Sequence, residues 1–128
     1  MEYFFSKILN TEFDNAIKLT QEALKVEGFG VISEINMHEK LKEKLNVNFK
    51  RYTILGACNP AFAYKALQAE DKIGTMLPCN VLVIEQGQNK IEIAAVNPIA
   101  SMQAITNPAL GDVAQQVTEK LKNVIANL

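Results

Sequence analysis

Two apolar segments on either side of a short turn constrain the fold of this chain more than any other feature. Residues 79–86 and 90–96 are rich in Val, Ile and Ala, and Gly87-Gln88-Asn89 between them favours a turn. We therefore expect an antiparallel β-hairpin whose two strands are joined by this turn.

Both faces of the predicted hairpin are apolar. Side chains alternate between the two faces of a strand, so each face is described by every second residue. Helices of the same chain can cover one face, and a partner must then cover the other, which favours a homodimer. One set of alternate positions holds Val81, Val83, Ile91 and Ile93, and the other holds Leu82, Ile84 and Ala94.

Extended and helical patterns alternate along the rest of the chain. The order β-α-β-α-β-α-β-β-α predicts an α+β fold with an antiparallel or mixed sheet and with helices packed mainly on one face. No linker or internal repeat interrupts it, so we expect residues 1–128 to form a single domain. The other strands are expected at 2–9, 29–35 and 51–58, and the four helices of this order from Thr11, Asn36, Asn59 and Leu110. A further short helix, opened by Asn97, is expected between the hairpin and the last helix.

Capping residues support the helix boundaries. The dipeptide Asn-Pro occurs at 59–60, 97–98 and 107–108, and each copy suits an N-cap followed by a proline at the first helical position. The other expected boundary residues are Thr11 at an N-cap, Asn36 and Glu39 in a capping box, and Gly28 after the end of the first helix.

Charge and composition argue against several classes of function. With 13 basic and 14 acidic side chains, the net charge is −1, which gives no general attraction to nucleic acids or anionic membranes. Glu2 stands where a secretory signal would be basic, and no apolar run approaches the roughly 20 residues of a membrane span. We expect a cytoplasmic protein with reduced thiols that binds neither nucleic acid nor membrane.

The two cysteines are the best candidates for a functional site. Cys58 ends a predicted strand directly before a helix, and a helix N-terminus stabilises a thiolate. Cys79 begins the next strand, between Pro78 and Asn80. If those strands are antiparallel neighbours, the two sulfur atoms lie near each other. Buried packing, a ligand or redox site, a metal site and a disulfide are the alternatives for this pair.

A metal site is not predicted. A closed zinc site needs four ligands, and the chain offers two cysteines, a single histidine and no C-x-x-C spacing. We expect that histidine, His38, to be exposed and without a functional role. Phosphate-binding glycine motifs and paired catalytic carboxylates are also absent.

Polar side chains near the predicted strand ends complete the candidate site. A small-molecule site is usually apolar with a few convergent polar groups, and hydroxyl and amide side chains supply such groups here. Their alternative roles are packing and helix or turn capping. The candidate ligand-binding residues are Cys58, Asn59, Pro60, Cys79, Asn80, Tyr52 and Asn97.

The cysteine motifs resemble those of a prokaryotic family, the "domain of unknown function 302" family. The segments are ILGACNP at 54–60 and LPCNV at 77–81, and the likeness extends to 28–31, 97–98 and 107–110. The resemblance implies an α+β fold similar to the TATA-box-binding-protein-like class, commonly assembled as a dimer, and no established reaction. Relatives often carry an acidic residue where this chain has Asn36 and Asn97, which weakens any proposal that needs a carboxylate there.

Three hypotheses follow for the function, and the cofactor, if there is one, is not identified. The first is a dimeric small-molecule-binding module with its site around Cys58 and Cys79. The second is a thiol-dependent enzyme or redox sensor that uses one or both cysteines. The third is a structural dimerisation or interaction module in which the motifs only pack.

Overall fold

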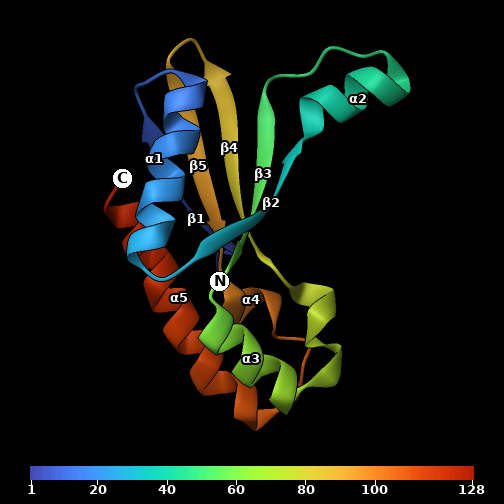
Figure 1. The fold of residues 1–128 in the computed structure, drawn as a ribbon, viewed down its shortest axis with the longest axis vertical. Helices are drawn as coiled ribbons and strands as arrows, with labels where there is room; N and C mark the ends of the chain where they lie inside the picture. The colour runs from blue at the N-terminus through green and yellow to red at the C-terminus, as the bar shows by residue number, and fades with distance from the viewer.

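The structure is a computed structural model that describes residues 1–128. Its five strands lie in one antiparallel sheet (Figure 1). The spatial order is β1-β5-β4-β3-β2, so β1 and β2 form the two edges. This confirms the predicted α+β class and selects the antiparallel alternative. The strands are β1 (Phe4–Leu9), β2 (Gly30–Asn36), β3 (Tyr52–Cys58), β4 (Cys79–Gly87) and β5 (Lys90–Val96).

The predicted hairpin is formed by β4 and β5. Val83 pairs with Ile93, and Gly87 pairs with Lys90 across the turn. Asn89 in the turn has a φ of 53°, a left-handed conformation that Asn adopts more readily than most residues. The residues of the turn and the apolar pattern of the strands therefore favour the same pairing of β4 with β5.

Two long helices cover one face of the sheet. Helix α1 (Phe13–Val26) and helix α5 (Gly111–Ala126) contact each other and bury Phe13, Leu24 and Leu121 against the strands. This confirms the prediction that the helices pack mainly on one face. The strand residues in this core are Leu55, Ala57, Cys79, Val81, Val83, Ile91, Ile93 and Ala95.

The shorter helices lie away from this layer. Helix α3 (Pro60–Ala69), the 3₁₀ turn η1 (Asp71–Met76), helix α4 (Pro98–Ser101) and the turn η2 (Pro108–Leu110) gather beyond one end of the sheet, beside α5 (Figure 1). Their shared small core contains Ala66, Ile73 and Leu110. This group is called the lower lobe below.

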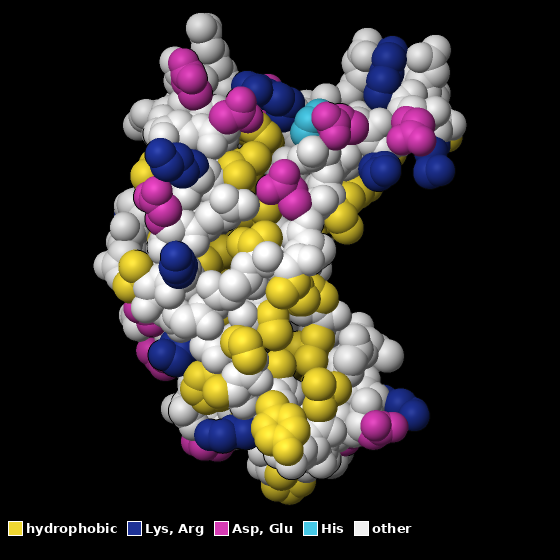
Figure 2. All heavy atoms as spheres, viewed as in Figure 1, with side chains coloured by type: hydrophobic (Ala, Val, Ile, Leu, Met, Phe, Trp, Pro, Cys, Tyr) yellow, Lys and Arg dark blue, Asp and Glu magenta, His cyan; other side chains and the backbone are white.

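Helix α2 (Met37–Leu45) projects from the other end of the sheet as an arm (Figure 1). Its apolar stripe of Met37, Leu41 and Leu45 is present in the sequence, yet no residue of α2 is buried. In the space-filling view the outline is hollowed between this arm and the lower lobe (Figure 2).

Several of the predicted caps are wrong. Helix α1 begins one residue later than expected, and the Thr11 hydroxyl instead accepts a hydrogen bond from the Asn15 amide at 2.8 Å. Asn36 makes no cap bond, because its side chain bonds Thr53 (2.7 Å) and Glu39 (3.0 Å). In both cases side chains took the place of the local backbone N–H: Asn15, four residues on, for Thr11, and Glu39 and Thr53 for Asn36.

The other boundary predictions hold in part. Asn97 and Asn107 accept hydrogen bonds from Ile99 N–H and Ala109 N–H, as N-caps do. Gly28 follows α1 with a φ of 86°, the left-handed conformation expected after a helix end. Asn59, by contrast, makes no cap bond to α3.

The second face of the sheet has no helix over it. Its residues, defined here as the open face, alternate with those of the core and take no part in it. Ile35 is 42% exposed at the β2 edge of this face. The apolar side chains of the open face include Ile35, Tyr52, Ile54, Leu82, Ile84 and Ala94.

None of the helices combines the length and the apolar character that a membrane crossing requires.

Candidate functional site

A cavity of about 280 Å³ lies where the end of the sheet meets the lower lobe. Strand ends supply one wall, α3 and α4 supply others, and the first turns of α5 close it. Figure 2 shows hydrophobic side chains gathered over this part of the surface. Its lining consists of Phe29, Ile32, Ala57, Cys58, Asn59, Phe62, Ala63, Ala66, Leu67, Leu77, Pro78, Cys79, Pro98, Met102, Val113, Ala114 and Val117.

Both cysteines line this cavity. Strands β3 and β4 are antiparallel neighbours, and Cys79 is the Cα partner of Ala57, the residue directly before Cys58. The two thiols are free: they form no disulfide. The sequence predicted that, if β3 and β4 were antiparallel neighbours, the end of β3 would lie beside the start of β4. The pairing of Ala57 with Cys79 confirms this arrangement.

The two thiols differ in their exposure. Cys79 is 8% exposed, whereas Cys58 is half-buried. Burial raises the pKa of the Cys79 thiol to about 11, and the neighbouring Cys58 adds to the rise. Cys79 is thus a neutral thiol at physiological pH, because a thiolate there would lose its hydration.

Asn59 is the only lining residue whose side chain carries oxygen or nitrogen. Its Nδ2 donates a long hydrogen bond of 3.4 Å to the Glu27 carbonyl, and its Oδ1 accepts none. Space for this amide depends on Gly28, where a Cβ atom would lie 3.2 Å from Asn59 Nδ2. The absence of a cap bond leaves the Asn59 amide available to a ligand.

The remaining candidate residues lie elsewhere. Tyr52 and Asn80 line a separate hollow on the open face of the sheet. Asn97 is buried, caps α4 and donates from Nδ2 to the Glu2 carbonyl at 2.9 Å. Pro60 occupies the first position of α3, is exposed and does not line the cavity.

Sequence reasoning missed most of the cavity wall. Four residues of α3 (Phe62, Ala63, Ala66 and Leu67) face it with helical spacing, a pattern that equally indicates an ordinary core face. Three residues of α5 complete the wall from the far end of the chain: Val113, Ala114 and Val117. No local signal distinguishes these from the rest of the amphipathic stripe.

Gly56 has a steric role beside the site. A Cβ atom at this position would overlap the Ser33 hydroxyl and lie 2.8 Å from Cγ of Pro78. The space beside Gly56 is therefore filled by the Ser33 and Pro78 side chains rather than by a ligand. The peptide bond between Leu77 and Pro78 is cis. Gly56 thereby allows the segment before Cys79 to pack on β3.

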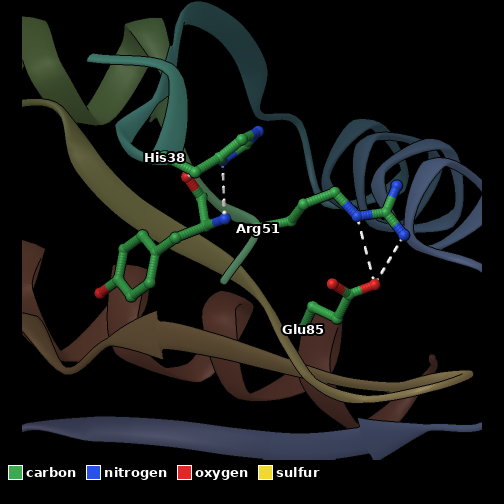
Figure 3. Close-up of polar contacts among 4 residues, drawn as sticks. His38, Arg51 and Glu85 are labelled. Atoms are coloured by element: carbon green, nitrogen blue, oxygen red, sulfur yellow. Dashed lines mark hydrogen bonds and ion pairs between the residues drawn. The ribbon is translucent and has the colours of Figure 1, made fainter. Parts of the chain in front are cut away.

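A second polar group of residues lies at the opposite end of β3 (Figure 3). His38 is half-buried, and its Nδ1 accepts a hydrogen bond from Tyr52 N–H at 2.9 Å, so the prediction that it is exposed is wrong. Arg51 donates to Glu85 at 2.6 Å and lies 4.7 Å above the centre of the Phe13 ring. The Arg51 hydrogen bond lowers the pKa of Glu85.

This second group joins β3 to α2, α1 and β4. His38 Nδ1, Arg51 Nε and Nη2, and Glu85 Oε2 each bond a protein group, which suits a structural role. No set of three or more His, Cys, Asp or Glu side chains in the molecule is placed to hold a metal ion. The Cys58–Cys79 cavity is consequently the better candidate for a functional site.

Comparisons with known proteins agree with the motif resemblance. The family model described as "Domain of unknown function DUF302" matches residues 5–128. The crystal structure of an uncharacterized conserved DUF302 protein from Bacillus stearothermophilus is similar, with a TM-score of 0.90 and 28% sequence identity over 98% of each chain. A search among curated proteins gave no match.

Proposed function

This chain belongs to the DUF302 family, and we propose that it is a small-molecule-binding module whose site is the Cys58–Cys79 cavity. The observation that carries the proposal is the cavity itself, which is apolar and lined by the family-like cysteine motifs. Concave apolar sites with a few polar groups are the usual form of a small-molecule site.

The energetics of the cavity support occupation by an apolar molecule. Transfer of apolar surface from water is favourable by roughly 25 cal/mol per Å². Phe29, Phe62 and Val117 present such surface from three separate segments of the chain. A ligand of matching shape would therefore gain most of its affinity from the walls and its orientation from the polar groups near Cys58.

A fluorescent apolar dye tests the proposal. Nile red is expected to bind the wild-type protein and to brighten, and Ala63→Phe should weaken its binding by about ten-fold or more because the new ring fills the cavity. Ala61→Phe is the matched control, since Ala61 lies on the same helix but is exposed and outside the cavity. Equal dye binding by both variants would reject the site.

Thiol chemistry receives less support. A nucleophilic or redox-active cysteine needs an accessible thiolate, and the raised pKa of Cys79 disfavours one. Cys58 is the more exposed thiol, so any reaction of a bound electrophile would begin there. We therefore assign the cysteines to the wall of a binding site rather than to catalysis.

We also propose that two copies pair through the open faces of their sheets. A two-fold interface uses the same surface of both copies, and the open face carries partly exposed apolar side chains such as Ile35 and Leu82, although Ile84 and Ala94 are buried within one chain. Leu82→Lys should convert a dimer to a monomer in light scattering, whereas Gln88→Lys in the exposed turn should not. A wild-type protein with the mass of one chain would refute the pairing.

A cytoplasmic location fits this proposal. With two cysteines in 128 residues, the chain lacks the cysteine density that small secreted domains use for their disulfides.

A further inference from the structure

We infer that the ligand of the Cys58–Cys79 cavity is an uncharged, mainly apolar molecule with a single hydrogen-bonding group. The inference rests on the proposed binding function and narrows it to a chemical class. It excludes fatty-acid anions, phosphorylated compounds and amines.

The lining carries the argument. None of its seventeen residues is Asp, Glu, Lys, Arg or His, and only Asn59 offers an amide. A charged group moved into such a site loses hydration without gaining an ion partner, which is far more costly than burying a neutral polar group. The apolar lining therefore disfavours charged ligands whatever their shape.

The Cys79 thiol shows the same effect within the protein. Its ionisation is disfavoured mainly by burial, which raises its pKa to about 11. A ligand carboxylate placed beside it would meet the same loss of hydration. Burial in these walls therefore disfavours a charged group of the protein for the same reason that it disfavours a charged ligand.

The Lys65 ammonium favours a competing class of ligand, the anionic amphiphiles. The Lys65 ammonium lies 5.5 Å from the centre of the Phe62 ring, and Phe62 lines the cavity. An anionic amphiphile could in principle place its tail in the cavity and its head beside Lys65. Lys65 is exposed, however, and an ion pair in solvent contributes little to affinity.

The polar group of the ligand is assigned to Asn59. Its Oδ1 has no partner, and its Nδ2 makes only one long hydrogen bond, so the amide can accept from a hydroxyl or donate to a carbonyl. The cavity volume of about 280 Å³ corresponds to roughly nine water molecules at about 30 Å³ each. A medium-chain alcohol or ketone, or a small substituted ring, has this size.

Three ligands of equal chain length test the inference. In calorimetric titrations at neutral pH, octanol is expected to bind at least about ten-fold more tightly than octanoate or octylamine. Asn59→Leu should weaken octanol binding by about two- to ten-fold, the usual range for one hydrogen bond. Asn59→Asp, which keeps the shape and adds a negative charge, should instead improve octylamine binding.

The possible results distinguish a failure of the charge inference from a failure of the binding site itself. Octanoate binding as tight as octanol, lost in Lys65→Gln, would overturn the charge inference and leave the binding site standing. No binding of any of the three, together with dye binding that Ala63→Phe does not change, would overturn both. Octanol binding that is lost in Ala63→Phe and kept in Ala61→Phe, with both ions excluded, supports both.

Discussion

Cys58 and Cys79 show how two neighbouring residues of one type acquire different chemistry. They line the same cavity, but one ends a strand at the surface and the other begins a strand beneath it. Proximity alone therefore does not define a redox pair. The two thiols differ in exposure, and burial raises the pKa of Cys79.

This difference predicts selective alkylation. At pH 8, roughly one Cys79 thiol in a thousand is ionised if its pKa is about 11, so iodoacetamide should modify Cys58 first in the native protein. Peptide mass spectrometry after timed quenching measures both rates. Similar rates for the two thiols in the folded state would contradict the assigned burial.

The same shift fixes the sign of a stability effect at alkaline pH. The folded-state pKa is raised from an ordinary value of 9.0, so the unfolded chain releases the Cys79 proton first. The neutral thiol contributes fully below pH 9, and its contribution is lost as the pH rises toward about 11. Cys79→Ala should reduce this alkaline loss in urea unfolding.

Gly56 gives a second prediction at this scale. Gly56→Ala should lower the free energy of unfolding by about 1–3 kcal/mol, because its Cβ would press on the Pro78 ring and the Ser33 hydroxyl. Gly30→Ala is the matched control, since a Cβ there meets no atom within 4 Å. Equal urea midpoints for the two variants would show that the segment at Pro78 moves freely.

At the scale of elements, the sequence predicted strands and long helices well. The hairpin, α1 and α5 were predictable because alternation and helical periodicity are strong in those segments. The caps were less predictable, since the Asn36 and Asn59 amides bond groups from other segments. A capping residue can satisfy a distant partner as easily as its own helix.

Helix α2 shows that an amphipathic pattern does not establish burial. Its Leu45 is 66% exposed, so Leu45→Ala should change the free energy of unfolding by no more than about 0.5 kcal/mol. Leu24→Ala in α1 should cost about 2–5 kcal/mol, because Leu24 is fully buried. Chemical unfolding of the two variants measures both values.

A large loss for Leu45→Ala would show that the arm is packed in solution. The partner would then be a second copy, and the loss would fall as the protein is diluted.

At the scale of the whole molecule, the candidate site was only partly predictable. The cysteine motifs identified the strand ends, because antiparallel neighbours bring the end of β3 beside the start of β4. The α5 wall was not predictable, because Val113 and Val117 come close to Cys58 only when the chain is folded. That residues 1–128 form a single domain stays a prediction.

The two apolar surfaces of the molecule have different shapes and therefore different proposed partners. The open face is spread over the central strands and suits a second copy, whereas the cavity is concave and suits a small molecule. Tyr52 and Asn80 belong to the first surface and Cys58 and Cys79 to the second. The residues grouped as one site from the sequence thus divide between two surfaces.

The most direct test of the binding site is a titration of the ¹⁵N-labelled protein with octanol, followed by amide chemical shifts. Saturable shifts are expected at Cys58, Asn59, Phe62 and Val117, which border the cavity from three segments of the chain. Shifts confined to the open face at Ile54 and Leu82, or shifts that grow without saturation, would contradict a ligand site between the two cysteines.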